Sequence, residues 1–196
     1  MSNLRIENKY LFEPKSKNKI VNQIINNKYR EIYPKRLINS IYFDTRNLQC
    51  YTDSVEGVVP RKKFRIRKYN DSNEYKKEIK EVTPNGKFKS NSDIFSIPSS
   101  ILDRDYKILF PIVSITYSRL YFGNEFIRIT LDYDIRYNAL NNKTQYRSPY
   151  LVVETKLSDD MDYKQSINDF KLFNLNNESF SKYKEACEMC ILNITK

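Results

Sequence analysis

Much of the chain alternates between polar and apolar residues, a pattern typical of strands, whose side chains point to opposite faces of a sheet in turn. Residues 61–69 place cations on one face and Phe64 and Ile66 on the other. The cations of that face are Arg61, Lys63, Arg65 and Arg67. The polar stretch 70–73 is typical of a turn, so residues 74–80 should return antiparallel with charges again on one face. Same-face residues lie about 6–7 Å apart, which suits a ladder of cations that binds a chain of negative charges.

The rest of the chain shows similar patterns. Alternation predicts further strands at residues 5–12, 37–44, 112–122, 125–137 and 150–157. Helical patterns are expected at residues 15–28, 162–172 and 179–192. Residues 47–60 should form a loop or a short helix. Residues 90–110 are rich in Ser, Asn and Asp and should form a surface connection with at most a short helix.

The polar faces of the predicted strands all carry the same residue types, namely Arg, Lys, Glu and Asp. The predicted architecture follows from this shared charge. In residues 126–136, one face carries Arg128 and Asp132 while the other is apolar. An ordinary sandwich strand points its apolar face inward and scatters polar residues outward. The economical arrangement here is therefore a mainly β fold, a closed antiparallel barrel with a charged interior and helices over part of its exterior. Asp132 should orient a basic neighbour such as Arg128, and one domain is expected over residues 1–196.

Composition and charge narrow the class of partner. The net charge of +10 and the pI near 9.3 point to an anionic partner, whether nucleic acid, a phosphorylated metabolite or a membrane surface. No apolar run approaches the roughly 18–20 residues that cross a bilayer, and the first residues do not open a signal peptide. We therefore expect a soluble, cytoplasmic protein. A membrane barrel has the same alternation, but its outer faces would carry Asn8, Lys77 and Glu81.

The chain contains no histidine. This excludes Ser-His and Cys-His nucleophilic catalysis and the usual imidazole sites for zinc, copper or iron. Any metal must be bound by oxygen ligands, which favours Mg²⁺ or Mn²⁺. Cys187 and Cys190 form a Cys-x-x-Cys without a second pair, so they are expected to be buried residues of a helix rather than zinc ligands.

Several short motifs occur in a specific order. They are Arg5-x-Glu7-x-Lys9-Tyr10, Ser40-Ile41-Tyr42-Phe43-Asp44-Thr45, Arg65-x-Arg67-x-Tyr69, Glu78-x-Lys80, Tyr117-x-Arg119, Arg128-x-Thr130-x-Asp132, Val153-Glu154-x-Lys156 and Ser181-Lys182-Tyr183. In this order they resemble the VTC domain, the polyphosphate polymerase family of the triphosphate tunnel metalloenzyme (CYTH-like) superfamily. The resemblance covers nearly the whole chain. It implies a tunnel of about eight antiparallel strands with a charged lumen.

The resemblance also implies a set of site residues. Those that match the family's phosphate-binding and catalytic cations are Lys9, Arg65, Arg67, Lys80, Arg119, Arg128 and Lys182. Further phosphate ligands are expected at Arg5, Lys63, Lys89 and Lys156, with Lys87 as fair a candidate as Lys89. Glu154 matches the family's metal-binding carboxylate. Glu7 and Glu78 would bind metal, directly or through water, or orient neighbouring lysines.

The function that the resemblance implies is an ATP-polyphosphate phosphotransferase, which uses Mn²⁺ or Mg²⁺ to transfer the γ-phosphate of ATP onto inorganic polyphosphate. A tunnel triphosphatase is the alternative, disfavoured because that branch has Glu where this chain has Arg5. A binding module without activity is the third reading, since Tyr51-Thr52-Asp53-Ser54 stands where an additional arginine is expected. Nucleic acid is disfavoured because the cation ladder should face inward, although Lys62, Lys68 and Lys77 point outward. Without a transmembrane segment of its own, the chain would be soluble or recruited to a membrane by a partner protein.

Overall fold

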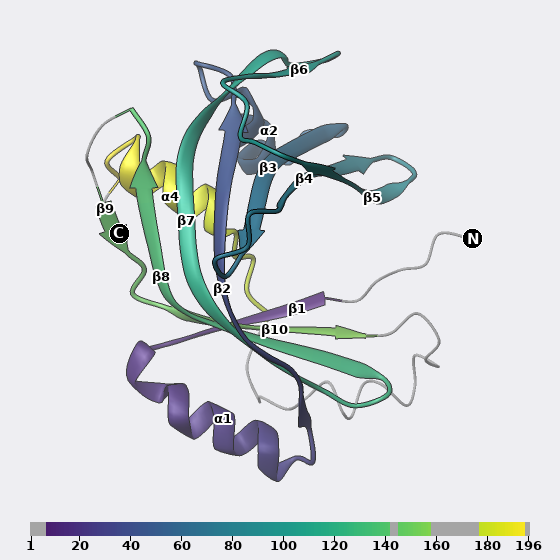
Figure 1. The fold of residues 1–196 in the computed structure, drawn as a ribbon, viewed down its shortest axis with the longest axis vertical. Helices are drawn as coiled ribbons and strands as arrows, with labels where there is room; N and C mark the ends of the chain where they lie inside the picture. The colour runs from purple at the N-terminus through teal and green to yellow at the C-terminus, as the bar shows by residue number, and fades with distance from the viewer. Residues whose placement is uncertain (1–6, 142–144, 158–176, 195–196) are drawn as a thin grey trace. The chain divides into compact units, whose positions relative to one another are not determined.

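The structure is a computed structural model, and it describes residues 7–141, 145–157 and 177–194 (Figure 1). The strands are β1 (Glu7–Phe12), β2 (Arg30–Asp44), β3 (Arg61–Tyr69), β4 (Tyr75–Thr83), β5 (Gly86–Ile94), β6 (Ile101–Asp103), β7 (Lys107–Gly123), β8 (Ile127–Ala139), β9 (Gln145–Arg147) and β10 (Leu151–Leu157). The helices are α1 (Lys17–Asn26), α2 (Gln49–Glu56) and α4 (Lys182–Cys190), with a 3₁₀ turn at Pro14–Ser16 before α1. The expected mainly β fold is confirmed.

The sheet follows the order β1-β10-β8-β7-β2-β3-β4-β5, with β6 beside β7 and β9 beside β8. The pairs β1–β10, β10–β8, β2–β3, β3–β4 and β4–β5 are antiparallel. Over the described residues, β1 and β5 stand at the two ends of this order, so the sheet is not closed. The prediction of a closed barrel was wrong in this respect. Alternation along a strand reports which face is buried, but it carries no information on whether the outermost strands pair.

The chain forms two compact units, and β2, β7 and β8 each contribute residues to both. One unit falls within Met1–Arg36, Tyr117–Ile135 and Ser148–Phe180. We call it the first unit. The second unit falls within Leu37–Thr116, Arg136–Arg147 and Ser181–Lys196. Each unit has its own core, and each is described by itself below.

The core of the first unit lies between α1 and one face of β1, β10 and β8 (Figure 1). The register aligns Tyr10 with Val153 and Val153 with Leu131. These buried side chains pack with Ile20 and Ile24 of α1. Because faces alternate, the residues between them in sequence turn to the opposite face, which is charged. The predicted separation of polar and apolar faces is confirmed here.

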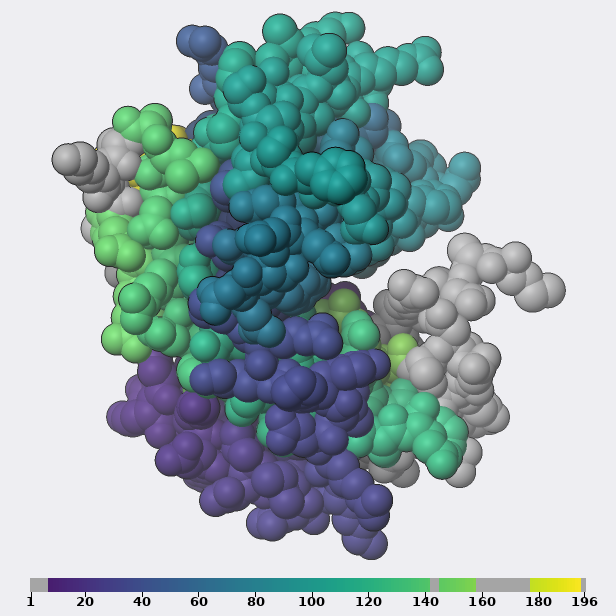
Figure 2. Space-filling model, viewed as in Figure 1, coloured from purple at the N-terminus to yellow at the C-terminus, as the bar shows by residue number. Residues whose placement is uncertain are grey.

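The core of the second unit includes Phe43 of β2, Phe64 and Ile66 of β3, and Cys50 of α2. The register aligns Arg65 with Glu78 across β3 and β4, as expected for a tight antiparallel return. The other strand neighbour of β4 is β5, which is exposed along nearly all its length and lies at the surface in Figure 2.

The local predictions succeeded for the basic strands and the terminal helix but missed parts of the sheet. The region 90–110 forms the end of β5, all of β6 and the start of β7 rather than a connection. Its polar residues lack strand periodicity, and β5 exists because it pairs with β4 along nine aligned residue pairs. All three cysteines are free and buried, and Cys187 and Cys190 lie on α4 as predicted. The helix predicted at 162–172 lies outside the described residues.

Candidate functional site: two charged clusters

The first charged cluster, which we call the basic face, covers one side of β3, β4 and β5 in the second unit. Strand alternation brings its members to the same side, and the register aligns Arg65 with Glu78 and Lys63 with Lys80. Lys80 in turn aligns with Lys89 of β5. The basic face consists of Lys63, Arg65, Arg67, Glu78, Lys80 and Lys89. It contains Lys63, Arg65 and Arg67 of the ladder of cations that the sequence pattern predicted. Arg61, the fourth cation of that predicted ladder, instead donates to the carbonyls of Val58 and Gly57.

One carboxylate organises this face. Glu78 is buried, accepts a short hydrogen bond from Arg65 Nε, and lies 2.6 Å from Lys89 Nζ. Burial alone would raise the pKa of Glu78, but Arg65, Arg67 and Lys89 outweigh it and lower the pKa to about 2. Glu78 is therefore ionised and orients the two cations. Lys89, rather than the alternative Lys87, belongs to this network.

Tyrosines connect the basic face to α4. Arg65 Nη1 lies 3.1 Å from the hydroxyl of Tyr42, and the ring of Tyr42 stacks on Tyr183 with centroids 4.9 Å apart and planes at 18°. Tyr183 donates a short hydrogen bond to Asp44. Lys63 Nζ lies 3.4 Å from Ser181 Oγ, which caps the N-terminus of α4. Lys182, the first residue of that helix, is thereby held in the second unit together with the basic face.

Asp44 was not among the predicted site residues, yet it fixes both helices of the second unit. Besides the bond from Tyr183, it accepts backbone N–H bonds from Cys50 and Tyr51 at 2.8 and 3.0 Å. A carboxylate at the start of α2 satisfies donors that a helix leaves unpaired and is favoured by the helix dipole. The preference for Asp at a helix N-cap could not identify Asp44 from the sequence, because the N-cap residue of α2 is Leu48.

Tyr42 provides a test of how the basic face responds to pH. Burial would raise the pKa of its phenol, but Arg65, Arg67 and Lys80 lower it to about 8. The phenol is neutral below that pH and becomes an anion above it, which would neutralise part of the charge of the basic face. We expect affinity for inorganic tripolyphosphate to fall about fivefold between pH 7 and pH 9, the effect of roughly 1 kcal/mol between neighbouring charges. Titration calorimetry of Tyr42→Phe should show a smaller fall, and an unchanged fall would contradict this role.

The second charged cluster, which we call the β10 cluster, lies in the first unit on the face opposite α1. Lys156 Nζ is 2.6 Å from Glu154 Oε1 and 3.0 Å from Glu7 Oε2. Lys9 Nζ is 3.6 Å from Glu7 Oε1 and donates to the carbonyl of Phe180 at 2.8 Å. Burial would raise the pKa of Glu154, but Lys156, Arg119 and Lys9 outweigh it and hold the pKa well below its usual range. Glu154 is thus an ionised carboxylate among cations.

Arg119 belongs to the same unit and forms a buried ion pair. Its Nη2 lies 2.7 Å from Asp132 Oδ2, and its Nε donates to the other carboxylate oxygen, so the contact is bidentate. The sequence predicted that Asp132 orients a basic neighbour, and the structure shows that this neighbour is Arg119. Arg128 is exposed and aligns instead with Lys156 of β10.

The donor set of the β10 cluster fits a hard divalent ion. Glu154 and Glu7 both contact the ammonium of Lys156, so their carboxylates lie near each other and would be the residues that hold an ion. Thr130 aligns with Glu154, and its buried Oγ1 has no hydrogen-bond partner among the residues that the structure describes. Oxygen ligands of this type suit Mg²⁺ or Mn²⁺. In the part of the chain that the structure describes, no group of three or more Asp, Glu, Cys or His gathers at one point, so water or phosphate oxygens would complete the shell.

The predicted site residues therefore divide between the two units. The first unit holds Glu7, Lys9, Arg119, Arg128, Glu154 and Lys156, and the second holds Lys63, Arg65, Arg67, Glu78, Lys80, Lys89 and Lys182. Arg5 lies outside the described residues. Tyr42, Asp44 and Tyr183 were not predicted as site residues, because their contacts join residues far apart in sequence. None of the described helices is long and apolar enough to cross a membrane.

Comparison with known proteins gives a family and a fold. The VTC domain model matches residues 4–96 and 76–191. No curated protein matches the chain. The PH1012 protein of Pyrococcus horikoshii OT3 is similar at 13% identity, covering 93% of this chain and 99% of its own, with a TM-score of 0.57. A Bacillus halodurans protein provisionally named an adenylate cyclase is similar at 16% identity, covering 89% and 94%, with a TM-score of 0.55.

A third solved structure is also similar in fold to this chain. HpAC1 of Hippeastrum, provisionally named an adenylyl cyclase, has a dominant triphosphatase activity. It is 11% identical, the match covers 96% of this chain and 97% of that one, and the TM-score is 0.52. At these identities the likeness is one of fold.

Proposed function

This chain belongs to the VTC domain family, and from that premise we propose that it transfers the γ-phosphoryl group of ATP onto a growing chain of inorganic polyphosphate. The observation that carries the proposal is the basic face. Its Lys and Arg side chains repeat along neighbouring strands at the spacing of successive residues on one face, about 6–7 Å. A repeated row of cations matches a polymer of negative charges better than it matches a single small anion.

The chemistry requires positioning and charge neutralisation rather than covalent work by the protein. Arg65 is held by Glu78 and Tyr42, and Arg119 by Asp132, so both guanidinium groups are oriented before a phosphate arrives. A planar guanidinium binds phosphate oxygens through two parallel hydrogen bonds. The attacking group would be the terminal phosphate of the polymer, which is already anionic. No general base is needed, which agrees with a chain that has no histidine.

The metal would be bound by Glu154 and Glu7 of the β10 cluster. When bound, a divalent ion would supply positive charge that offsets the negative charge of the phosphates. The chain's own residues prepare for it: Lys156 contacts both carboxylates and holds them near each other, and Lys9 is positioned beside Glu7. Mn²⁺ and Mg²⁺ both fit an oxygen donor set.

Hydrolysis of a triphosphate is the second candidate function. The triphosphatase activity of HpAC1, which has a similar fold, favours it. Arg5 argues against it, because it stands where the hydrolytic branch has a carboxylate. Both reactions use the same cations, so the products decide between them.

The test is to incubate the purified protein with ATP and Mn²⁺ and to separate polyphosphate from free phosphate by gel electrophoresis. We expect polyphosphate. Lys80→Ala should reduce its formation at least about tenfold, since one charge-assisted contact is worth roughly 1.5–3 kcal/mol. Lys77→Ala is the matched control, because Lys77 lies on the same strand but on the opposite face. Free phosphate without polymer would assign the chain to the triphosphatases, and neither product, with polyphosphate bound, would assign a binding module.

A further inference from the structure

A polar cavity of about 380 Å³ lies in the second unit, and neither charged cluster explains it. Its walls include Gln49 and Asp53 of α2, Arg61 and Lys62 of β3, and Asp105 and Tyr106. Lys62 alternates with Lys63 along β3, so it points away from the basic face. None of the six residues of the basic face lines the cavity, so the cavity is a separate feature of the second unit.

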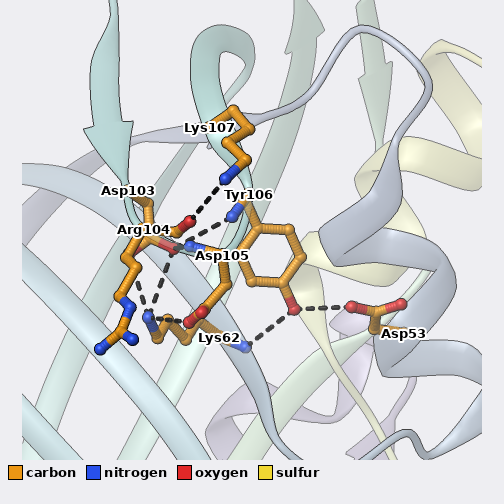
Figure 3. A network of polar contacts seen from close by, with 7 residues as sticks. All are labelled: Asp53, Lys62, Asp103, Arg104, Asp105, Tyr106 and Lys107. Carbon is orange, nitrogen blue, oxygen red and sulfur yellow. Dashed lines mark hydrogen bonds and ion pairs between the residues drawn. The ribbon is translucent and has the colours of Figure 1, made fainter.

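Lys62 is already neutralised by carboxylates. Its Nζ lies 3.1 Å from Asp103 Oδ2 and 2.6 Å from Asp105 Oδ2, and Figure 3 shows the ammonium between the two. Asp103 also accepts backbone N–H bonds from Asp105 and Tyr106, which hold the loop in place. The ammonium of Lys62 is thus shared by two acids, and among the described residues it forms no ion pair with Asp53.

Asp53 is a buried carboxylate of the cavity wall whose hydrogen-bond partners carry no positive charge. It is only 8% exposed, and it accepts hydrogen bonds from Gln49 Nε2 at 2.7 Å and from the Tyr106 hydroxyl at 2.6 Å (Figure 3 shows the second). Both donors are neutral. In the described ranges 7–141, 145–157 and 177–194, no Lys or Arg pairs with Asp53. A buried carboxylate is normally paired with a cation, and one with two hydrogen bonds can accept about two more.

Burial and Asp53 both raise the pKa values of two neighbouring groups, Tyr106 and Cys50. Burial raises the pKa of the Tyr106 phenol well above its usual value, and the hydrogen bond to Asp53 adds to the rise. Burial likewise raises the pKa of Cys50, and Asp44, Asp53 and Asp103 add to it. Although the net charge of the chain is +10, the two cations of the cavity lining, Arg61 and Lys62, are matched there by Asp53 and Asp105, and Asp103 adds a further acid beside Lys62.

We propose that this cavity binds a small molecule that carries an ammonium group, with Asp53 as its counter-ion. The ring of Tyr106 supplies an aromatic wall of the kind that ammonium groups favour. Arg61 offers a second contact. Its Nη1 donates to the carbonyls of Val58 at 2.8 Å and Gly57 at 3.4 Å, and within the described part of the chain its other N–H groups have no partner. A ligand with a carboxylate as well as an ammonium group, such as an amino acid, would contact Asp53 with its ammonium group and Arg61 with its carboxylate.

The test compares three compounds of equal chain length by titration calorimetry and ligand-observed NMR, without nucleotide or metal. n-Butylamine carries the ammonium group alone, 4-aminobutanoate carries ammonium and carboxylate, and butanoate carries the carboxylate alone. We expect the two ammonium compounds to bind and butanoate not to bind. Asp53→Asn should weaken ammonium binding at least about tenfold, the value of a charge-assisted hydrogen bond. Arg61→Gln should weaken only 4-aminobutanoate.

Asp93→Asn is the control for charge, because Asp93 is an exposed carboxylate of β5 outside the cavity, and it should bind like the unaltered chain. Binding of butanoate as tight as that of n-butylamine, or absence of binding by both ammonium compounds, would overturn the proposal. Equal ammonium binding by Asp53→Asn would do so as well. If Asp53→Asn does not fold, the three compounds measured on the unaltered chain still test whether the cavity prefers an ammonium group to a carboxylate. Since no ATP is present, the result is separate from that of the polyphosphate assay.

Discussion

Substitution of Glu154 by glutamine is expected to lower metal-dependent phosphoryl transfer at least about a hundredfold while leaving the chain folded. Glutamine keeps the size of the side chain but removes the charge that an ion would need. Losing one electrostatic element of a phosphoryl-transfer site typically costs about 10²–10³ in rate. The fold should persist because Lys156 retains Glu7 as a partner at 3.0 Å. Polyphosphate formation from ATP and Mn²⁺ measures the loss, and the melting temperature checks the fold.

The matched control is Glu125→Gln, an exposed carboxylate of the same unit with the same change in charge. It should keep full activity. A second measurement, the binding of Mn²⁺ followed by its electron paramagnetic resonance signal, should show weaker binding in Glu154→Gln and no change in Glu125→Gln. Native activity in Glu154→Gln would remove Glu154 from the proposed site. Loss of activity with unchanged Mn²⁺ binding would instead assign it a role in orienting Lys156 and Lys9.

Substitution of Asp132 by asparagine should produce the largest loss of stability. Asp132 is 1% exposed and forms a bidentate pair with Arg119, whose side chain is also mostly buried. Removing one partner leaves an uncompensated charge in the interior, which costs roughly 3–5 kcal/mol. For a chain of this length each kcal/mol lowers the melting temperature by about 2–4 °C, so a fall of about 6–20 °C is expected. Thermal unfolding followed by circular dichroism measures it.

A double variant separates the burial of charge from the role of the pair. Arg119→Met combined with Asp132→Leu removes both charges and should recover most of the lost stability, because buried ion pairs can often be replaced by apolar residues at little cost. The same variant should remain inactive in polyphosphate synthesis, since it lacks a proposed phosphate ligand. An unchanged melting temperature in Asp132→Asn would show that the pair does not constrain the fold. Full activity in the double variant would show that Arg119 does not bind phosphate.

The sequence by itself determined which face is charged in the strands that alternation predicted. Alternation of Arg65 and Arg67 with Phe64 and Ile66 is a local property, because successive side chains of a strand point to opposite sides wherever the strand lies. Most of the ladder of cations and the turn after Tyr69 were predictable for that reason. Helical spacing separately predicted a helix at residues 179–192, which the structure shows as α4 at Lys182–Cys190. The short motifs and their order could also be recognised from the sequence alone. The match to the VTC domain model confirmed the family.

Only the tertiary structure decided which charges meet. Asp132 pairs with Arg119 rather than Arg128, and Asp44 holds Tyr183 from 139 positions away. Such pairs depend on the register between strands and on how helices pack, which are set by the burial of whole faces and not by spacing along the chain. For the same reason the pattern could not show that β1 and β5 end the sheet order, or that polar residues 90–94 form a strand against β4. Local periodicity predicts the face of the strand on which a side chain lies. The tertiary packing determines which residue that side chain contacts.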